Sequence, residues 1–432
     1  MIALAAALLL QVPIPVRILP PDTTLPRVTL AEAIRLSTGV DPAYVRAAGR
    51  VDNAEWGRRA AVLAFIIPSL AVSLDATRYS TAFFNIGIGA PTSNAVNFRA
   101  NAVYELLSVR KITDLGFTKA ELEATQANAE RQRFQTAFDT ESDFLNVLIS
   151  RELARVAHSR YERAQEQLTV ARARVLSGAA VQTDSLQLVL ELTQARVDVL
   201  RQDLSLRVSR LQLGRRIGRD GPVDAQVTDS MLPPDLPYTD QQLIQLALQQ
   251  APQYREARSL ARSASYSLKG QKGAYLPTFN LTGGFTEYDS RFPPSGQGVG
   301  SISLIVTWPL WDRGQREIAV QQAKTNLAVA QAVSADLERS AARDVTQAAE
   351  AYRISREAVD LTQVQLVAAQ ETFRVQDLRY KSGANTILDL LEAQFQLTRA
   401  ESEAVQSVFA LYLSLAGLEA ITGQEFLVRR NQ

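Results

Sequence analysis

An internal repeat constrains this chain more than any other feature of its sequence. The stretches "SGAAVQTDSLQLVLELTQA" at 177–195 and "SGANTILDLLEAQFQLTRA" at 382–400 share Ser-Gly-Ala, an Asp after four further residues, and Leu-Thr-x-Ala at the end. Each matching position lies 205 residues from its partner, as for Asp184 and Asp389. Such self-similarity indicates that the chain folds as two copies of one structural unit.

The repeat extends over most of the chain. "VTLAEAIRLSTGVDPAYVRAAGR" at 28–50 aligns with "YTDQQLIQLALQQAPQYREARSL" at 238–260, and "TDLGFTKAELEATQ" at 113–126 aligns with "WDRGQREIAVQQAK" at 311–324. The two copies meet in a Pro-rich stretch at 221–240, whose composition is typical of a linker.

The predicted division of the chain follows from this repeat. We expect a signal peptide at 1–18, a first repeat at 19–220, a linker at 221–238, a second repeat at 239–424 and a C-terminal tail at 425–432. The N-terminal run "MIALAAALLLQVPIP" is shorter than the roughly 20 apolar residues of a membrane-spanning helix. We interpret it as an export signal, with a buried N-terminal segment as the alternative. No later stretch has about 18 consecutive apolar residues, so no membrane-spanning helix is expected.

The composition excludes several classes of function. The chain has no cysteine, which rules out disulfides and thiolate metal ligands, and its only histidine is His158, which is expected to be solvated on a charged helix surface. A net charge of +1 provides no basic excess for binding nucleic acid. No acid–base pair, nucleophile motif or metal cluster stands out, so we expect no enzyme, no metal and no cofactor.

Each copy is expected to contribute two strands. Apolar and polar residues alternate in 98–106 and again in 301–308, which is the period of a half-exposed strand. Four strands of about ten residues cannot leave their edges exposed, so they pair with another layer or close into a membrane barrel with other chains. The glycine-bearing stretches 87–98 and 295–301 are interpreted as loops between strands. Candidates for interfacial aromatic belts, or for packing anchors, are Tyr79, Tyr288, Trp308 and Trp311.

The remaining sequence of each copy predicts long helices in antiparallel hairpins, because apolar residues recur every three or four positions. One predicted seam comprises Leu153, Ala157, Tyr161, Ala164, Leu168, Ala171 and Val175. A second comprises Leu186, Leu190, Thr193, Val197, Leu200, Leu204, Val208 and Leu211. A third comprises Leu391, Phe395, Thr398, Ser402, Val405, Phe409, Tyr412 and Ala416. A helix over 116–175 would be about 90 Å long, which indicates a tube or a rod.

The opening frame fits the reversal between two such helices. Gly178 and Gly383 suit the left-handed conformation at a helix end. Asp184 and Asp389 then begin the returning helices, where a carboxylate meets the positive end of the helix dipole. This placement alone explains the paired aspartates as purely structural residues, and a functional role is the alternative.

The two-copy layout, the "WPLWDRGQ" passage and the paired Gly-x5-Asp turns resemble the TolC family of outer-membrane efflux proteins. The resemblance covers residues 28–423, and "YKSGANTILDLLEAQFQL" at 380–397 is its most specific part. It implies an α+β membrane protein that forms a homotrimer, with four strands from each chain in a 12-stranded β-barrel embedded in outer-membrane lipid. Long coiled-coil helices would form a periplasmic α-barrel that docks onto a periplasmic adaptor and an inner-membrane transporter.

The resemblance also implies site residues at the turns. The periplasmic aperture would be formed by Tyr380, Asp389 and Glu392, and the sequence departs from the family at Asn385, where the family has an arginine. Only the second copy carries this acid and this tyrosine, since Glu392 aligns with Gln187 and Tyr380 aligns with Val175. The turns expected to contact the adaptor are Ser177, Gly178, Ala179, Ser382, Gly383 and Ala384.

Small-molecule efflux through an outer-membrane channel is therefore the function that the sequence favours. Export of a protein in a type I secretion system is an alternative, because the family serves both uses. A coiled-coil scaffold of the cell envelope is an alternative of another class, although it leaves the alternating strands unexplained.

Overall fold

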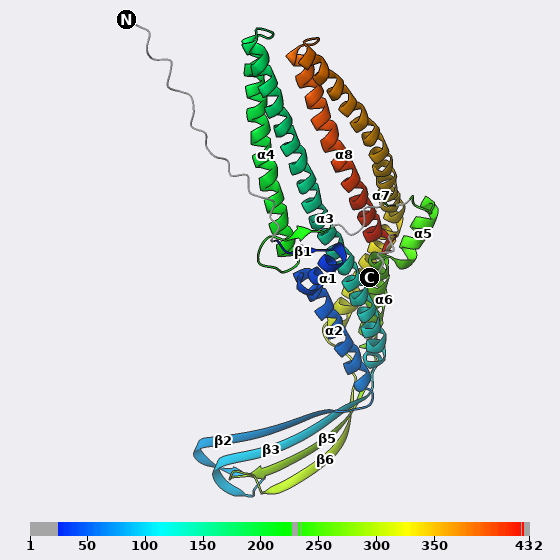
Figure 1. The fold of residues 1–432 in the computed structure, drawn as a ribbon. Coiled ribbons are helices and arrows are strands. Elements are labelled where there is room, and N and C mark those ends of the chain that lie inside the picture. Colours follow the sequence, from blue (N-terminus) through cyan, green and yellow to red (C-terminus); the bar gives the residue numbers. More distant parts are fainter. Residues whose placement is uncertain (1–24, 227–231, 234, 425, 427–432) are drawn as a thin grey trace.

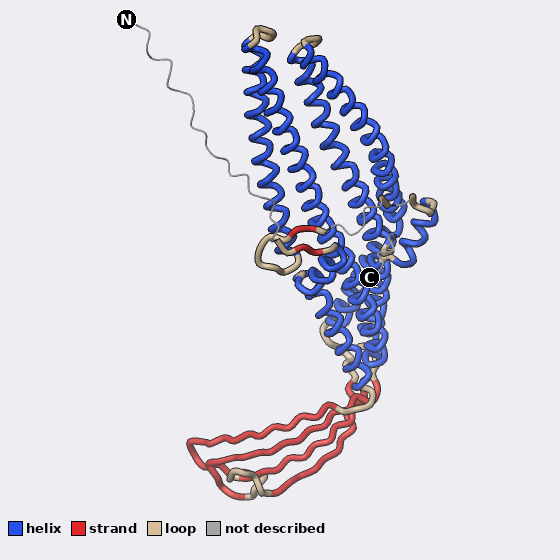
Figure 2. The backbone as a smooth tube through the Cα atoms, viewed as in Figure 1, coloured by secondary structure: helices blue, strands red, loops and turns tan. Residues whose placement is uncertain are grey.

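The computed structural model of the chain describes residues 25–226, 232–233, 235–424 and 426. The predicted signal peptide and, apart from Phe426, the predicted C-terminal tail lie outside these residues. A four-stranded sheet lies at one end of the molecule, and long helices run from it to two turns at the opposite end (Figure 1). Strands and helices thus occupy separate parts of the molecule, apart from a small pair of strands beside the helices (Figure 2).

The same order of elements occurs twice along the chain. The first half contains α1 (Leu30–Val40), α2 (Pro42–Leu63), β2 (Ser69–Asn85), β3 (Ala90–Leu107), α3 (Val109–Leu176) and α4 (Gln182–Arg216). The second half contains α5 (Asp240–Gln250), α6 (Pro252–Gly273), β5 (Thr278–Asp289), β6 (Gln297–Thr307), α7 (Gln315–Ser382) and α8 (Ile387–Thr422). Two short strands, β1 (Arg27–Val28) and β4 (Asp224–Ala225), pair in parallel.

Local sequence fixes where the helices begin and how far they run. The Thr29 hydroxyl and the Asp41 carboxylate accept hydrogen bonds from backbone N–H groups at the starts of α1 and α2. Thr239 and Gln242 form a capping box at the start of α5. Helices α3 and α7 contain no proline and extend over 68 residues each, which corresponds to about 100 Å.

The long helices form a single layer. Next to the sheet the helices lie in the order α2, α3, α6, α7, and toward the turns the order is α4, α3, α8, α7 (Figure 1). Helices α3 and α7 run through both parts. Within the described chain, α2 and α4 therefore border one open side of the layer and α7 borders the other.

The sheet has open edges on the same two sides. Its strands lie in the antiparallel order β2, β3, β5, β6, and no described strand pairs with the outer edges of β2 and β6. Strand β2 follows α2 directly, and β6 leads into α7. The open edges of the sheet thus continue the open sides of the helix layer.

The four predicted strands are present, but two are longer than predicted. β2 has 17 residues and β3 has 18, whereas β5 and β6 have 12 and 11. The prediction of loops at 87–98 and 295–301 was wrong for most of these residues, since β3 begins at Ala90 and β6 at Gln297. Ladder hydrogen bonds to β2 and β5 override the local preference of these glycine-bearing stretches for turns.

The predicted seam on α3 is confirmed for four of its seven residues, because Ala157, Ala164, Leu168 and Ala171 are buried, and the other three are partly buried. His158, which was expected to be solvated only, lies 3.1 Å from a carboxylate oxygen of Asp203 on α4.

The predicted hairpin seam on α4 was wrong. All eight of its residues are exposed, with Leu200 at 50% and Leu204 at 63%. α4 contacts α3 instead through the opposite face, which carries Leu188, Ala195 and Val199. The periodicity identified an apolar face without identifying its partner. We call this exposed row the α4 stripe, and its residues are Leu186, Leu190, Thr193, Val197, Leu200, Leu204, Val208 and Leu211.

By length and composition, one described helix, α8, could cross a membrane. No membrane-spanning helix was expected because no unbroken apolar run occurs in the sequence, but α8 has a high mean hydropathy despite its interspersed polar residues. α8 packs along α7 and against α3, and Leu411, Leu415 and Leu418 are buried there. These contacts account for its apolar composition within the helix layer.

The predicted linker contains ordered structure at its start. Val223, Asp224 and Ala225 are buried, and β4 pairs with β1 beside α3 and α4. The backbone N–H of Val223 donates to the carbonyl of Arg210 at 3.1 Å, so this segment folds back onto α4.

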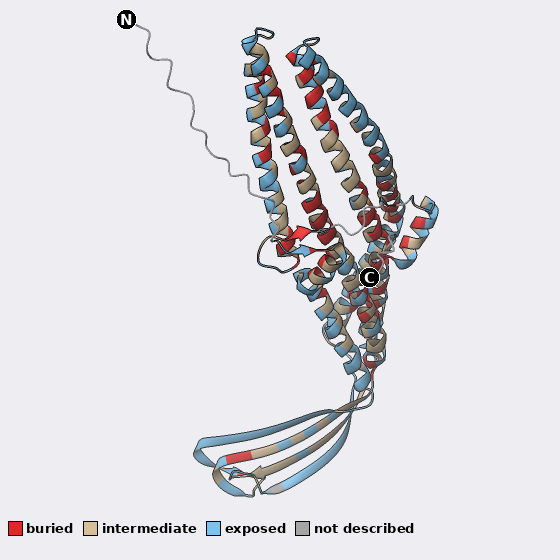
Figure 3. Cartoon of the chain, in the orientation of Figure 1, coloured by how far each residue is buried: buried red, intermediate tan, exposed pale blue. Residues whose placement is uncertain are grey.

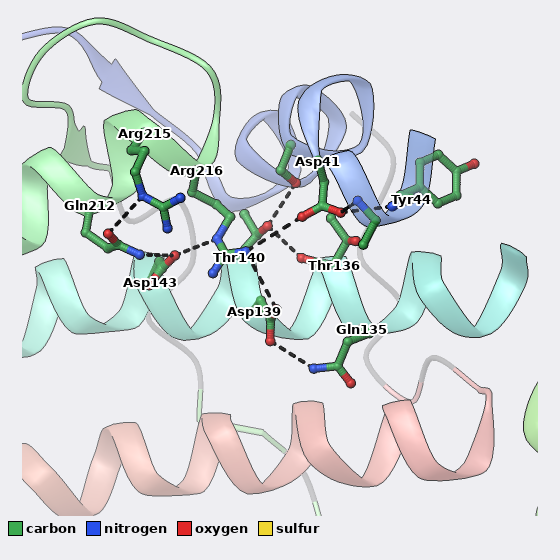
Figure 4. Close-up of polar contacts among 12 residues, drawn as sticks. Asp41, Tyr44, Gln135, Thr136, Asp139, Thr140, Asp143, Gln212, Arg215 and Arg216 are labelled. Atoms are coloured by element: carbon green, nitrogen blue, oxygen red, sulfur yellow. Dashed lines mark hydrogen bonds and ion pairs between the residues drawn. The ribbon is translucent and has the colours of Figure 1, made fainter. Parts of the chain in front are cut away.

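A polar network connects the junction of α1 and α2 to α3 and α4 (Figure 4). Nε of Arg216 lies 2.7 Å from Asp143 Oδ2, and its Nη1 lies 3.6 Å from Asp139 and 3.8 Å from Asp41. One guanidinium on α4 thus compensates three carboxylates, two on α3 and one at the junction of α1 and α2. Nearby, the buried Thr140 hydroxyl donates to the carbonyl of Thr136 at 2.6 Å.

Gly214→Ala is expected to destabilise this region by about 1–3 kcal/mol, as overpacking typically does. A Cβ at Gly214 would lie 2.0 Å from the backbone carbonyl oxygen of Gly221, so the returning segment would have to move. Gly57→Ala is the matched control, because a Cβ there meets nothing within 4 Å and alanine favours the helix. Thermal unfolding of the detergent-extracted protein measures both variants, and equal melting temperatures would contradict the prediction.

Candidate functional site

The two turns that join the long helices share one hydrogen-bond pattern. In the first turn, residues 177–181, the N–H of Ala179 donates to the carbonyl of Arg174 at 2.8 Å. In the second turn, residues 383–386, the N–H of Ala384 donates to the carbonyl of Arg379 at 2.7 Å. Each turn thus closes the preceding helix in the same way, as the sequence repeat predicted.

Glycine is required at one position in each turn. Gly178 has φ of +73° and Gly383 has φ of +83°, which is the left-handed region that other residues rarely adopt. The six predicted adaptor-contact residues, Ser177, Gly178, Ala179, Ser382, Gly383 and Ala384, are all exposed at the end of the molecule farthest from the sheet.

The two returning helices begin differently, although Asp184 and Asp389 occupy equivalent positions. At α8, Thr386 and Asp389 form a capping box in which the Asp389 carboxylate accepts from the Thr386 N–H at 3.0 Å and from its hydroxyl at 2.7 Å. At α4 the N-cap is Val181, which has no side-chain hydrogen bond to offer. The Thr386 side chain, followed by its backbone N–H, lowers the pKa of Asp389 below its usual range.

Glu392 and Asn385 lie close to this cap in the chain. Glu392 is exposed on α8 and accepts a hydrogen bond from Gln396 at 2.7 Å. The Asn385 side-chain amide donates to the carbonyl of Gln376 at 3.1 Å and to its side chain at 2.8 Å. Asn385 therefore ties the second turn back to α7 and contributes no charge.

Tyr380 lies between the two helical hairpins. It is 2% exposed and packs in a cluster with residues of α3, α4 and α8, among them Leu168, Leu188 and Leu390. Burial raises the pKa of the Tyr380 hydroxyl, and the negative charge of Asp184 raises it further. Its ring is thus an internal contact of one chain, whereas Asp389 and Glu392 are exposed.

Sequence reasoning missed the cation that accompanies Tyr380. The Arg174 guanidinium lies 4.7 Å from the centre of the Tyr380 ring, and its Nη1 donates to the Tyr380 carbonyl. Its Nη2 donates to the carbonyl of Ala179 at 3.3 Å. Arg174 therefore joins the ends of the two hairpins. The repeat could have identified this residue, because Arg174 and Arg379 lie at the same distance before the paired residues Asp184 and Asp389.

Further polar contacts join the same two hairpins. Lys381 Nζ lies 2.8 Å from Asp377 on its own helix and 3.2 Å from Glu166 on α3. Farther from the turns, Arg163 on α3 pairs with Glu401 on α8 at 3.0 Å. These contacts continue the connection made by Arg174 along the helices. Within the described part of the chain, no group of three or more metal-ligating side chains is present.

The sheet at the opposite end has one apolar and one polar face. Residues paired across an antiparallel ladder point to the same face, and positions two apart along a strand share that face. The apolar face carries Leu70, Val72, Leu74, Ala100, Ala102, Leu281, Phe285, Ile302, Leu304 and Val306. The polar face carries Ser73, Asp75, Asn97, Arg99, Asn101, Thr282, Thr286, Ser301 and Ser303.

Two observations support this division of the sheet. Arg99 and Asp75 form an ion pair at 3.5 Å on the polar face. On the apolar face, the Phe285 ring lies within 2.6 Å of where a Cβ of Gly298 would be, so the aromatic ring covers the glycine. The predicted belt residues Trp308 and Trp311 lie at the helix end of the sheet and are 60% and 78% exposed.

A chain with such a two-faced sheet and a long helical extension has the architecture of an outer-membrane channel protein. Residues 243–424 match the model of the family described as outer membrane efflux protein. The chain is 24% identical over 315 residues to outer membrane efflux protein BepC of Brucella suis biovar 1. This match covers 69% of this chain and 67% of BepC. It is 20% identical over 379 residues to outer membrane protein TolC of Escherichia coli strain K12. This match covers 83% of this chain and 75% of TolC.

The fold agrees with these sequence matches. The structure superposes on a crystal structure of CusC with a TM-score of 0.77 and 17% identity over 92% of both chains. In sequence and in fold, the chain is similar to the TolC family of outer-membrane efflux proteins, as the sequence repeat and turns predicted. It is an outer-membrane protein with a long helical extension, and the relatives that it matches are outer-membrane efflux proteins.

Proposed function

We propose that three copies of this chain close into a passive conduit that carries small molecules across the periplasm and the outer membrane. The observation that carries this proposal is the coincidence of open sides in the sheet and in the helix layer. β2, α2 and α4 border one side, and β6 and α7 border the other. Joining one side to the other, copy after copy, would leave no edge unpaired.

The exposed apolar residues support the same closure. The α4 stripe lies on the first side. On the other side, α7 exposes Val329, Val333, Leu361, Val364 and Val367. Three chains would bring the four strands of each into a 12-stranded barrel, the size that the family resemblance implies. Each chain is then two repeats, bounded near residues 220 and 239, which wrap together around one axis.

The faces of the sheet fit a water-filled pore. A barrel in lipid needs an apolar outer surface and permits polar groups inside. The face with Leu70, Val72 and Ile302 would contact lipid, and the face with Asp75, Arg99 and Asn101 would line the lumen. A passive channel of this kind needs no catalytic residue and no cofactor.

The turns are proposed as the docking end. A periplasmic adaptor would contact the exposed small residues at Ser177–Ala179 and Ser382–Ala384, and an inner-membrane transporter would supply the substrate. Small side chains permit close approach of a partner backbone. Gly178 and Gly383 also have a structural reason to be glycine, so their contribution to docking is best tested at the neighbouring serines and alanines.

The acids of the second turn are proposed as the narrow periplasmic entrance. Three copies of Asp389 and Glu392 around the axis would attract cations and repel one another when the ends crowd together. Tyr380, held by Arg174 between the hairpins, would keep the entrance closed. Asn385 brings no cation to this ring, so its net charge stays negative.

Planar-bilayer conductance of the detergent-extracted protein tests this proposal. We expect discrete, cation-selective steps, and we expect Asp389→Ala/Glu392→Ala to lower cation conductance and to remove most of the selectivity, because the acids that attract cations to the entrance are gone. Because the Thr386 side chain and backbone N–H lower the pKa of Asp389, its carboxylate keeps its charge at a lower pH than an ordinary aspartate does, and its share of the selectivity should persist there.

The control variant is Asp52→Ala/Glu55→Ala, which removes two acids from α2, far from the turns. It should leave conductance and selectivity unchanged. A divalent cation should lower the conductance of the unsubstituted channel more than that of the Asp389→Ala/Glu392→Ala variant. Absence of conductance steps from a folded trimer, in both the unsubstituted and the substituted protein, would contradict the proposed channel.

A further inference from the structure

The hairpin of β2 and β3 bends sharply near the end of the sheet farthest from the helices. The ladder passes from the pair Arg78–Asn94 directly to the pair Phe83–Thr92. Four residues of β2 therefore lie opposite the single residue Ser93 of β3, which makes a large bulge. A bulge bends its strand and changes the direction of the residues beyond it. We call residues 83–92 beyond this bulge the outer tip.

The outer tip folds back over the sheet. A Cβ at Gly87 would lie 2.6 Å from Cγ and 2.9 Å from Cβ of Tyr288 on β5, so the tip backbone rests directly on this ring. The turn is closed by Asn85, whose carboxamide oxygen accepts from the Gly87 N–H at 2.9 Å. Asn85 is 9% exposed, and Ala95 at the base of the tip is 5% exposed. Figure 3 shows the buried segment of β3 in red near this end of the sheet.

The tip lies on the polar face of the sheet. Tyr288 pairs with Asn97 and lies two positions from Thr286, which pairs with Arg99. All of these residues share the face that carries the Asp75–Arg99 ion pair. Tyr79, at the bulge, contacts Phe83 of the tip with ring centroids 4.5 Å apart. The tip therefore extends over the surface that lines the lumen in the proposed channel.

We propose that the outer tip forms a second constriction, at the outer mouth of the barrel, which limits the size of molecules that leave the channel. This inference rests on the proposed trimeric channel. Three tips would reach inward around one axis. Each carries Phe84 and Ile86, which are 62% and 89% exposed in the single chain and would meet their counterparts there. Glycine at position 87 permits the tip to lie directly on Tyr288. Any side chain there would lift the tip from Tyr288 and so widen the proposed constriction.

Graded thiol labelling of intact cells tests the constriction from the outside. The chain has no cysteine, so Asn101→Cys introduces a single thiol on the polar face, below the tip. In the full-length tip, a small maleimide should react readily and a bulky maleimide–polyethylene glycol should react slowly. Replacing residues 84–91 by an Asn-Gly turn, which suits a two-residue hairpin, should speed the bulky reagent by about tenfold or more, because the constriction is removed.

Two further variants keep the test decisive. Tyr288→Ala preserves the hairpin and removes the ring beneath Gly87, so it should also speed the bulky reagent, by a smaller factor, even if the shortened hairpin fails to assemble. Phe292→Cys places a thiol in the exposed loop 290–296 and should react with both reagents in every background.

The outcomes separate this inference from the proposed channel. If the bulky reagent modifies Asn101→Cys at the same rate with full-length tip, shortened tip and Tyr288→Ala, the constriction is refuted and the channel stands. If even the small reagent fails to modify Asn101→Cys in the assembled shortened-tip variant while it modifies Phe292→Cys, the polar face does not line a water-filled lumen, and the channel itself is refuted.

Discussion

Leu204→Asp is expected to prevent assembly of the trimer and to abolish efflux. Leu204 is 63% exposed in the middle of the α4 stripe, on the side of the helix layer that would meet α7 of the next chain. A carboxylate there would be buried without a partner at each seam, which costs about 3 kcal/mol or more. Light scattering of the detergent-extracted protein should show monomers, and a strain that depends on this channel should lose resistance to its exported compounds.

Ser205→Asp is the matched control. It introduces the same charge at the adjacent, exposed position, which lies outside the stripe, and it should leave the trimer intact. If Leu204→Asp also forms normal amounts of trimer, the α4 stripe is not a seam between chains. The proposed arrangement of the copies would then have to be abandoned.

Arg174→Ala is expected to open the periplasmic entrance. The substitution removes the hydrogen bond to the Tyr380 carbonyl and the cation above the Tyr380 ring, which join the two hairpins at their ends. Hydrogen bonds from charged groups contribute about 1.5–3 kcal/mol when buried, and Arg174 is half-buried, so we expect roughly a tenfold rise in open probability. Single-channel recording in planar bilayers measures this rise directly.

Two variants sharpen the interpretation of Arg174. Arg172→Ala removes an exposed arginine two residues earlier on α3 and should leave the open probability unchanged. Arg174→Lys keeps the positive charge and should restore part of the closed state, because an ammonium group cannot reach both carbonyls as a guanidinium does. Identical recordings from Arg174→Ala and Arg172→Ala would show that this contact does not hold the entrance closed.

Much of the fold was accessible from sequence because the repeat and the periodicities are local. The turns at Gly178 and Gly383, the four strands and the long helices follow from residues close together in the chain. The α4 stripe was assigned to the wrong partner, because a row of apolar residues marks a buried face without specifying whether its own chain or another chain covers it.

The candidate site was predicted less completely, because its geometry depends on contacts between the two repeats. The sequence placed Asp389 at the start of the returning helix, where its capping box with Thr386 is a local contact, but the burial of Tyr380 depends on residues of both hairpins and was not predicted. Arg174 lies 206 residues from Tyr380 in the chain, and only the packing of one hairpin against the other brings them together. The bulge that redirects the outer tip was likewise not predicted, since it arises where the pairing register between β2 and β3 shifts after Arg78.

The unlike open sides of the chain have a genetic consequence. Because β2, α2 and α4 border one side and β6 and α7 the other, each seam in a ring of three would combine one side from each of two neighbours. A copy that carries Leu204→Asp would spoil only one of its two seams, so it could still be recruited through the intact one. In a cell expressing equal amounts of both versions, random mixing would leave about one ring in eight free of the defect. Inherited loss of this channel through an α4 substitution would therefore be dominant, whereas loss through a chain that never folds would be recessive.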